Sequence, residues 1–304
     1  MRRVLLLGGT GFIGSHVLQA LRRRPDLALM VLGHRNVDYR ALEDVNLVVS
    51  GVADLDFEWL EAFQPDTIIH LARLRGQRRI GRAFAARRGR RANARLIEWL
   101  CAHAPQTHVV YVSGTLVYGD RGDRETDELA EIRPASYARQ YILAEAPWMD
   151  AQREGRLPVT IVRPPWVIGS ASWFRQYFVL PALAAGSVPM YGSGRNWMSF
   201  LDVADCGAAI VHVAEHAEPG RNFNLFAPAQ AARQEEFVGV VADALGVRVG
   251  RVERVQQGRR AERAIMEALT SSLRSATVHP EVAWGYSFEV TRWQDMVERH
   301  VPSR

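Results

Sequence analysis

The sequence predicts an α/β protein with a doubly wound parallel sheet of the Rossmann type and a smaller C-terminal α/β lobe. Short, continuously apolar runs recur along the first half of the chain, amphipathic segments separate them, and a glycine-rich turn follows the first run. Strands that are buried on both faces have such continuous runs, and the helices between them cover the two faces of the sheet. The first half of the chain is therefore expected to form the sheet.

The hydrophobic period identifies each element in turn. Strands are predicted where apolar residues run together and end at a glycine or a polar residue. They cover residues 2–9, 27–33, 46–51, 66–72, 108–114 and 159–165. Helices are predicted where apolar residues recur every three or four positions. They cover residues 15–24, 57–63, 94–104 and 137–152.

Beyond Pro164 the pattern changes to aromatic and glycine-rich loops, followed by a predicted helix at 203–217 and a predicted strand at 221–226. We expect one domain of residues 1–163 with about 197–226, and a second lobe of residues 164–196 with 227–304. Because open α/β sheets bind ligands at the carboxyl ends of their strands, the second lobe is expected to cover this edge and to hold a substrate.

The glycine-rich turn predicts a dinucleotide site. Gly8, Gly11 and Gly14 form a G-x-x-G-x-x-G pattern directly between a predicted strand and a predicted helix. Glycines permit the tight turn, and they let backbone N–H groups approach a pyrophosphate at the N-terminus of the helix.

The end of the second predicted strand indicates which dinucleotide is bound. A carboxylate at this place would accept hydrogen bonds from the adenosine ribose of NAD, but the chain has Gly33, His34 and Arg35. Arginine can bind a 2′-phosphate, so NADP is favoured and NAD is the alternative. Arg35 as a solvated surface residue is the competing interpretation.

Composition limits the class of protein. Of the 304 residues, 48% are hydrophobic and 23% are charged, which is typical of a globular protein. The apolar run at the start is too short for a signal peptide and no segment reaches membrane-spanning length, so a cytoplasmic protein without membrane contact is expected. Cys101 and Cys206 lie too far apart in sequence to predict a disulfide framework or a thiolate metal site.

All 38 basic residues are arginine, and nine of them fall between Arg73 and Arg91 without an acidic residue. Such a run is typical of a solvated face. It could also bind nucleic acid, but no aromatic ladder accompanies it. Because it follows a strand end, we favour an anionic small molecule as its ligand. The segment His212–His216 fits an H-x-x-E-H zinc pattern, but we favour a solvated helix face there and predict no metal.

Several segments in this order resemble the extended short-chain dehydrogenase/reductase family, in its NAD-dependent epimerase/dehydratase group. The matching segments are Gly8–Ser15, His70–Ala72, Asn93, Val112–Gly119, Tyr137, Arg163–Pro164, Tyr191–Gly194, Ser199–Asp205 and Phe223–Leu225. The resemblance implies an enzyme that acts largely on nucleotide sugars. The expected cofactor contacts are Gly8, Thr10, Gly11, Phe12, Ile13, Gly14, His34, Arg35, Leu71, Ala72, Tyr137 and Pro164.

The family's catalytic residues are only partly present. The resemblance implies a tyrosine as general acid or base, which is Tyr137. A lysine four residues later would lower the pKa of this tyrosine, but the chain has Tyr141, and the expected serine or threonine is Gly114. Thr115 or Ser113 could replace the hydroxyl.

A free tyrosine titrates near pH 10, so proton donation by the neutral phenol is less demanding than proton abstraction by the phenolate. Arg139 or the basic run could replace the cation, and Tyr141 could act with Tyr137 or only pack near it.

These expectations favour an NADP(H)-dependent oxidoreductase that reduces a carbonyl of a small-molecule or nucleotide-sugar substrate in a biosynthetic pathway. Tyr137 would donate the proton, and Thr115 or Ser113 would polarise the oxygen. A non-redox isomerase, cyclase or lyase on the same fold is the alternative, and a catalytically silent cofactor-binding protein is another. The resemblance also implies a homodimer.

Overall fold

A computed structural model describes residues 1–33, 45–74, 79–228, 230–252 and 260–302. The chain divides into two compact units. The first unit comprises residues 1–113, 140–163 and 207–223, and the second comprises residues 114–139, 164–206 and 224–304. Each unit is described separately below. The domain boundaries expected from the sequence stay a prediction.

The first unit is built on a seven-stranded sheet in the order β11-β7-β5-β4-β1-β2-β3. Its strands are β1 (Arg2–Leu7), β2 (Leu27–Gly33), β3 (Asn46–Val49), β4 (Thr67–His70), β5 (His108–Val112), β7 (Val159–Arg163) and β11 (Asn222–Asn224). Strands β1 to β5 and β7 pair in parallel. The glycine-rich turn after β1 therefore lies at the carboxyl edge, with β2 on one side of it and β4 on the other.

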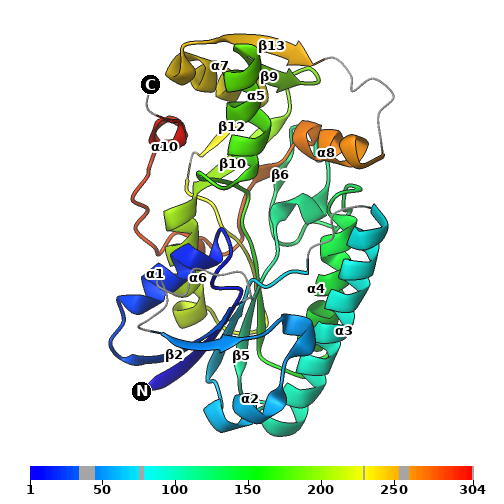
Figure 1. The fold of residues 1–304 in the computed structure, drawn as a ribbon, viewed down its shortest axis with the longest axis vertical. Coiled ribbons are helices and arrows are strands. Elements are labelled where there is room, and N and C mark those ends of the chain that lie inside the picture. Colours follow the sequence, from blue (N-terminus) through cyan, green and yellow to red (C-terminus); the bar gives the residue numbers. More distant parts are fainter. Residues whose placement is uncertain (34–44, 75–78, 229, 253–259, 303–304) are drawn as a thin grey trace. The chain divides into compact units, whose positions relative to one another are not determined.

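Helices cover both faces of this sheet (Figure 1). They are α1 (Gly14–Arg22), α2 (Phe57–Phe63), α3 (Arg79–His103), α4 (Arg139–Arg153) and α6 (Val203–His216), with the 3₁₀ turn η2 (Val52–Asp54). Helices α2, α3 and α4 pack on one face, where one buried apolar cluster includes Leu60, Leu96 and Trp148 with residues of β1, β4, β5 and β7. Helix α6 crosses α1.

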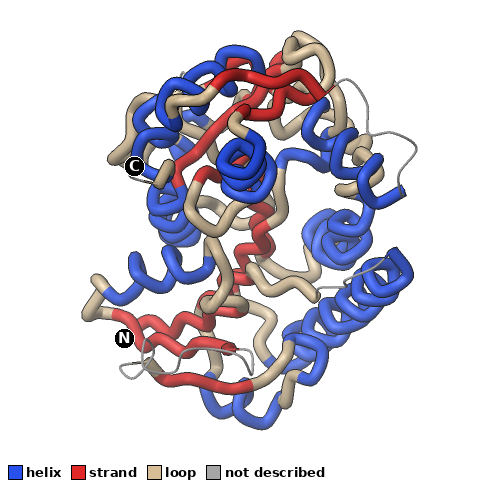
Figure 2. Tube along the Cα trace, turned by 45° about the horizontal axis from the view of Figure 1, so that its top comes forward, coloured by secondary structure: helices blue, strands red, loops and turns tan. Residues whose placement is uncertain are grey.

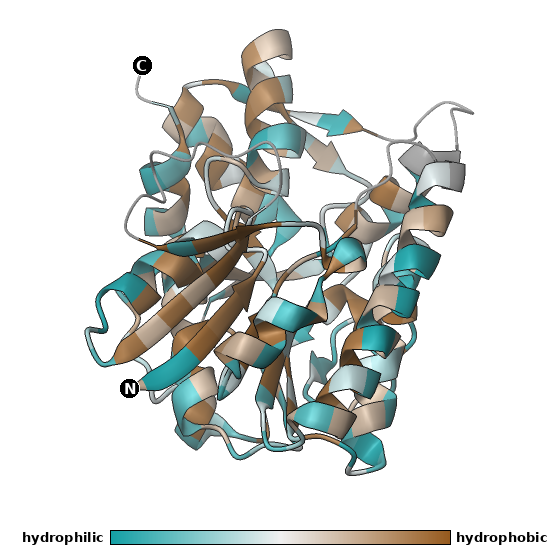
Figure 3. Cartoon of the chain, turned by 60° about the horizontal axis from the view of Figure 1, so that its bottom comes forward, coloured by the Kyte–Doolittle hydropathy of each residue, from teal (hydrophilic) through white to brown (hydrophobic). Residues whose placement is uncertain are grey.

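The strands are apolar along their length and the helices have one polar side (Figure 3). Leu5, Leu6 and Leu7 in β1 are fully buried, although successive side chains of a strand point to opposite faces. Burial of both faces explains why the predicted strands have continuous apolar runs and no alternation.

The second unit contains smaller sheets and short helices (Figure 2). Three strands are ordered β12-β10-β8, while β13 pairs with β9 and β14 pairs with β6. The strands are β6 (Glu125–Thr126), β8 (Trp166–Ile168), β9 (Ser187–Tyr191), β10 (Trp197–Asp202), β12 (Ala231–Arg233), β13 (Arg248–Val252) and β14 (Arg274–Ser275). The helices are η3 (Thr115–Tyr118), η4 (Arg175–Val179), α5 (Leu180–Ala185), α7 (Gln234–Leu245), α8 (Arg260–Thr270), α9 (Pro280–Ala283) and α10 (Trp293–His300).

The predicted fold class is confirmed, and two helices differ from their predicted extents. Helix α3 begins at Arg79, so most of the basic run is its N-terminal half. Helix α4 begins at Arg139 and not at Tyr137, because the Ala138 amide donates to Ala135 in a tighter turn. No helix in the described part of the chain combines the length and hydrophobicity needed to span a bilayer.

Helices α1 and α6 meet at a glycine. A Cβ atom added to Gly207 would lie 2.6 Å from the backbone carbonyl carbon of His16 and 2.8 Å from the amide nitrogen of Val17. Real Cβ atoms do not approach other atoms this closely, so any side chain at residue 207 would push α6 away from α1.

We expect Gly207→Ala to lower the free energy of unfolding by about 1–3 kcal/mol, the usual cost of overpacking. Gly239 in α7 is the matched control, because a Cβ added there meets no atom within 4 Å. Gly239→Ala should raise stability by up to about 1 kcal/mol through helix propensity. Urea unfolding measures both, and a Gly207→Ala variant as stable as the wild type would contradict the close crossing.

Candidate functional site

The glycine-rich turn leaves no room for a side chain at Gly8 or Gly14. Gly8 has φ +91°, and a Cβ added to it would lie 2.7 Å from the amide nitrogen of Ala72. A Cβ added to Gly14 would lie 2.0 Å from the carbonyl oxygen of Gly8. The Gly11 amide donates to the same oxygen at 3.0 Å. Leu71 and Ala72 therefore lie against the turn, and the cofactor contacts expected of them stay a prediction.

The turn also presents backbone donors. Within the described residues, the amides of Phe12 and Ile13 donate no hydrogen bond to the protein, and Ile13 is the N-cap of α1 with no side-chain cap. Unpaired amides at a helix N-terminus and the positive end of the helix dipole bind phosphate oxygens. The residues present therefore fit the pyrophosphate of a dinucleotide.

The end of β2 lies beside this turn, since a Cβ added to Gly33 would be 3.7 Å from the Thr10 methyl group. His34 and Arg35, on which the NADP prediction depends, lie outside the described residues.

Strand β4 ends in a buried polar contact. The Nε2–H of His70 donates to Asn93 Oδ1 at 3.0 Å, and Asn93 Nδ2 donates to the carbonyl of Ala144 at 2.8 Å. Asn93 therefore ties the end of β4 to α4. Burial lowers the pKa of His70 to about 4, and the positive charge of Arg73 acts in the same direction.

Ser113 belongs to a buried charged network. Its hydroxyl donates to Glu145 of α4, and Arg163 at the end of β7 donates to the other carboxylate oxygen at 2.8 Å. The side chains of Glu145 and Arg163 are 0% and 1% exposed. Removal of one partner from a buried ion pair strongly destabilises the folded protein, because the other charge is left buried and unpaired. The three residues are therefore expected to hold α4 against β5 and β7. The structure thus gives the Ser113 hydroxyl a partner within the protein.

Tyr141 lies under a guanidinium group. The Arg73 guanidinium carbon is 4.3 Å from the centre of the Tyr141 ring. Arg73 Nη2 also donates to the carbonyls of Val112 and Ser113, at 3.1 and 2.7 Å. Tyr141, where the resemblance implies a lysine, is therefore in contact with a cation that comes from the end of β4.

The remaining predicted residues lie in the second unit. Thr115 is buried in η3, and its amide donates to the carbonyl of the buried Pro164 at 3.0 Å. Gly114 precedes it in extended backbone with φ 176°. Tyr137 is partly buried against an aromatic core that includes Phe178, Phe200 and Phe237.

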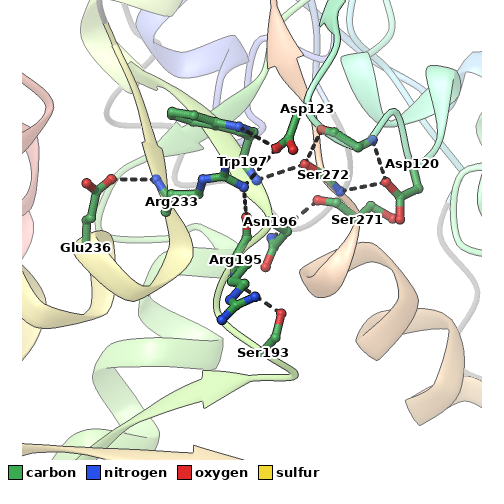
Figure 4. Close-up of polar contacts among 11 residues, drawn as sticks. Asp120, Asp123, Ser193, Arg195, Asn196, Trp197, Arg233, Glu236, Ser271 and Ser272 are labelled. Carbon is green, nitrogen blue, oxygen red and sulfur yellow. Dashed lines mark hydrogen bonds and ion pairs between the residues drawn. The ribbon is translucent and has the colours of Figure 1, made fainter.

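The glycine-rich segment around Trp197 forms a polar network in the second unit (Figure 4). Trp197 Nε1 donates to Asp123 at 3.1 Å, and Arg233 pairs with the same carboxylate at 2.9 Å while lying 4.4 Å above the Trp197 ring. Ser272 accepts from the Trp197 amide at 3.0 Å. The network joins the loop before β6 to β10, β12 and the segment after α8.

His212 and His216 do not form a metal site with Glu215. Their rings stack with centres 4.2 Å apart, and Glu215 pairs with Arg24. No group of three or more potential ligands that could hold a metal ion occurs in the described ranges of the chain.

The sequence reasoning did not identify Arg73, Glu145 or Asp123 individually. Glu145 follows Tyr141 at helical spacing, and its charge on the buried side of α4 was the available signal. Asp123 gave no signal, because its partners are distant in sequence.

Comparisons with known proteins bear on the whole chain. A sequence profile described as the NAD dependent epimerase/dehydratase family matches residues 4–225. The mouse (Mus musculus) dTDP-D-glucose 4,6-dehydratase is 28% identical over 256 residues, covering 74% of this chain and 68% of the mouse protein.

Solved structures show the same fold. The dTDP-glucose 4,6-dehydratase from Bacillus anthracis, in complex with NAD, has a TM-score of 0.78 at 18% identity over 99% of this chain and 96% of that one. The UDP-N-acetylglucosamine 4-epimerase from Methanobrevibacter ruminantium, in complex with UDP-N-acetylmuramic acid, has a TM-score of 0.78 at 19% identity over 99% of this chain and 97% of that one.

The low pKa of His70 predicts how stability depends on pH. The unfolded chain binds a proton near pH 6.5, whereas the folded chain does so near pH 4. The contribution of His70 to stability should therefore be complete above about pH 6.5 and fall by about 3 kcal/mol as the pH drops to about 4. Burial also lowers the pKa of His108 to about 4, so His108 adds to the loss in the wild type and in every His70 variant.

Urea unfolding across this range should show a smaller loss in His70→Gln, which keeps a donor for Asn93. The exposed His103 gives the control variant His103→Gln. An unchanged pH slope in His70→Gln would contradict a neutral, buried His70.

Proposed function

The chain belongs to the NAD dependent epimerase/dehydratase family, and from this membership we propose that it is an NADP(H)-dependent reductase. Its substrate is proposed to be an anionic small molecule, most simply a nucleotide sugar with a carbonyl group. The observation that carries the proposal is the turn in which Gly8 and Gly14 leave no room for a side chain, with unpaired amides at the N-terminus of α1, within a family match to residues 4–225. The named relatives include a dehydratase and an epimerase of nucleotide sugars, which supports this substrate class.

The cofactor, when bound, supplies the hydride. The turn from Gly8 to Gly14 would bind its pyrophosphate, Leu71 and Ala72 would border it, and Arg35 would bind a 2′-phosphate. Pro164 is proposed as a further contact. These roles follow from the donor groups and from the place of each residue at a strand end.

Tyr137 is proposed to donate the proton to the substrate oxygen. A neutral phenol is the major form near pH 7, so donation needs no cation to lower its pKa. Replacement of the lysine by Tyr141 is therefore more compatible with reduction than with proton abstraction from an alcohol. Because the Ser113 hydroxyl donates to Glu145, we assign the polarisation of the substrate oxygen to Thr115.

The hydrogen bond from the Ser113 hydroxyl to Glu145 also favours a second candidate function. A site without a free serine and without the lysine suits a non-redox isomerase, cyclase or lyase that keeps the cofactor as a structural element. A catalytically silent binding protein is the limiting case. The oligomeric state proposed from the family is a homodimer.

Tyr137→Phe should lower turnover by about a hundredfold or more, the scale of a positioned proton donor. Tyr141→Phe should change it little, because the phenol of Tyr141 moves no proton. Thr115→Val should also lower turnover, whereas Ser113→Ala should act mainly on stability. The assay follows NADPH oxidation with a panel of keto-sugar nucleotides. Full activity in Tyr137→Phe would contradict Tyr137 as the proton donor, whereas a wild type that oxidises NADPH with no substrate of the panel would favour the non-redox or silent candidates.

NADPH should bind more tightly than NADH. Arg35→Ala should remove about 1–3 kcal/mol of this preference, the range for a charge-assisted hydrogen bond. Fluorescence titration with both cofactors measures it. Equal affinities in the wild type would show that the end of β2 does not select the 2′-phosphate.

A further inference from the structure

The Arg73 guanidinium is fixed at the carboxyl edge of the first unit's sheet. Arg73 is the third residue after β4, and it donates to two carbonyls at the end of β5 while stacking on Tyr141 of α4. Holding a long arginine side chain in one position costs rotamer entropy. Two hydrogen bonds and a cation–π contact offset this cost, so the cation is preorganised.

No carboxylate in the described part of the chain pairs with Arg73, although many other arginines are paired. Arg73 is also an exposed residue. Carbonyl oxygens satisfy some of its donors without cancelling its charge. The positive charge of Arg73 also acts on a buried neighbour. Burial raises the pKa of Tyr111 to about 12, and the charge of Arg73 opposes that rise. An uncompensated cation held in place at this edge is suited to bind an anion or a polar oxygen.

The strand order defines which part of a dinucleotide lies near Arg73. The glycine-rich turn follows β1, and the adenosine half of a dinucleotide extends from it toward the end of β2. The other half must extend over β4 and β5. Arg73 follows Ala72, whose amide nitrogen lies 2.7 Å from a Cβ added to Gly8. Arg73 is thus next to the turn, on the side away from β2.

We propose that Arg73 binds the distal half of the dinucleotide, meaning its second phosphate and the ribose beyond it. Tyr141 acts as a positioning residue, because its ring supports the guanidinium. The chain has no lysine, and this arginine places a positive charge over the position that a lysine would fill in the family. The proposal rests on the cofactor binding proposed above and does not require that the enzyme be a reductase.

The test compares two probes that share one half of the cofactor. AMP contains the adenosine and one phosphate, whereas ADP-ribose adds the second phosphate and the distal ribose. Isothermal titration measures both affinities for the wild type, Arg73→Gln, Arg73→Lys and Tyr141→Leu. Arg23, an exposed arginine at the opposite end of α1, supplies the charge-matched control Arg23→Gln.

Arg73→Gln should weaken ADP-ribose by about ten- to a hundredfold and change AMP less than about twofold, as expected for one or two charge-assisted hydrogen bonds. The affinity of Arg73→Lys for ADP-ribose should fall between those of the wild type and Arg73→Gln, and Arg23→Gln should match the wild type. Tyr141→Leu removes the ring that lies under the guanidinium, so it should weaken ADP-ribose by about two- to fivefold and leave AMP unchanged. Glutamine keeps a donor for the carbonyls of Val112 and Ser113, and thermal unfolding verifies that each variant is folded.

Equal weakening of AMP and ADP-ribose in Arg73→Gln would overturn the proposal in favour of a general electrostatic or structural role. Unchanged affinity for ADP-ribose in Arg73→Gln would overturn it as well. A wild type that binds neither probe would overturn the cofactor proposal together with this one. The outcomes therefore separate a failure of the Arg73 assignment from a failure of the proposed function.

Discussion

Close contact between backbone segments around the first strand–helix turn governs the rest of the first unit. Gly14 lies against the carbonyl of Gly8, Gly8 lies against Ala72, and Gly207 lies against His16. These approaches fix α1 over β1, bring the end of β4 beside the turn and bring α6 onto α1. Without side chains between them, the amides at the start of α1 can face a ligand. The same contacts that pack the unit thus form the edge at which we propose that the pyrophosphate binds.

Local pattern was enough to predict the fold class and the strands of the first unit. The central strands β1, β4, β5 and β7 are buried on both faces, so their sequence signal is continuous and independent of their partners, whereas the edge strand β3 has no buried residue. The N-terminal half of α3 lacked such a signal, because the residues that it buries, among them Ala85 and Ala86, are small and stand among arginines, whereas the C-terminal half buries Leu96 and Leu100. The short strands of the second unit were missed for a related reason, since pairs such as β13 with β9 join segments far apart in the chain.

The residues of the candidate site also differ in whether the sequence alone could predict their positions. The glycine-rich turn could be predicted because its conformation depends on backbone within one strand–turn–helix segment. Leu71 and Ala72 lie beside it because β4 pairs with β1. Their contacts with a cofactor stay a prediction. The contacts of Arg73 with Tyr141, and of Ser113 with Glu145, depend on which helix packs against which strand end. Sequence alone indicated a basic run and a missing lysine, but it could not show which arginine of that run contacts the tyrosine.

The crossing of α1 and α6 has a consequence for how homologous sequences can diverge. Most packing contacts join two side chains, so an enlargement at one position can be balanced by a reduction at the other, and the two positions then vary together. At Gly207 the opposing atoms include the main chain of His16 and Val17, which no substitution removes. A second-site change at His16 cannot restore the lost space. Position 207 should therefore be invariant without a covarying partner, and methods that infer contacts from correlated substitutions would miss one of the tightest contacts in the first unit.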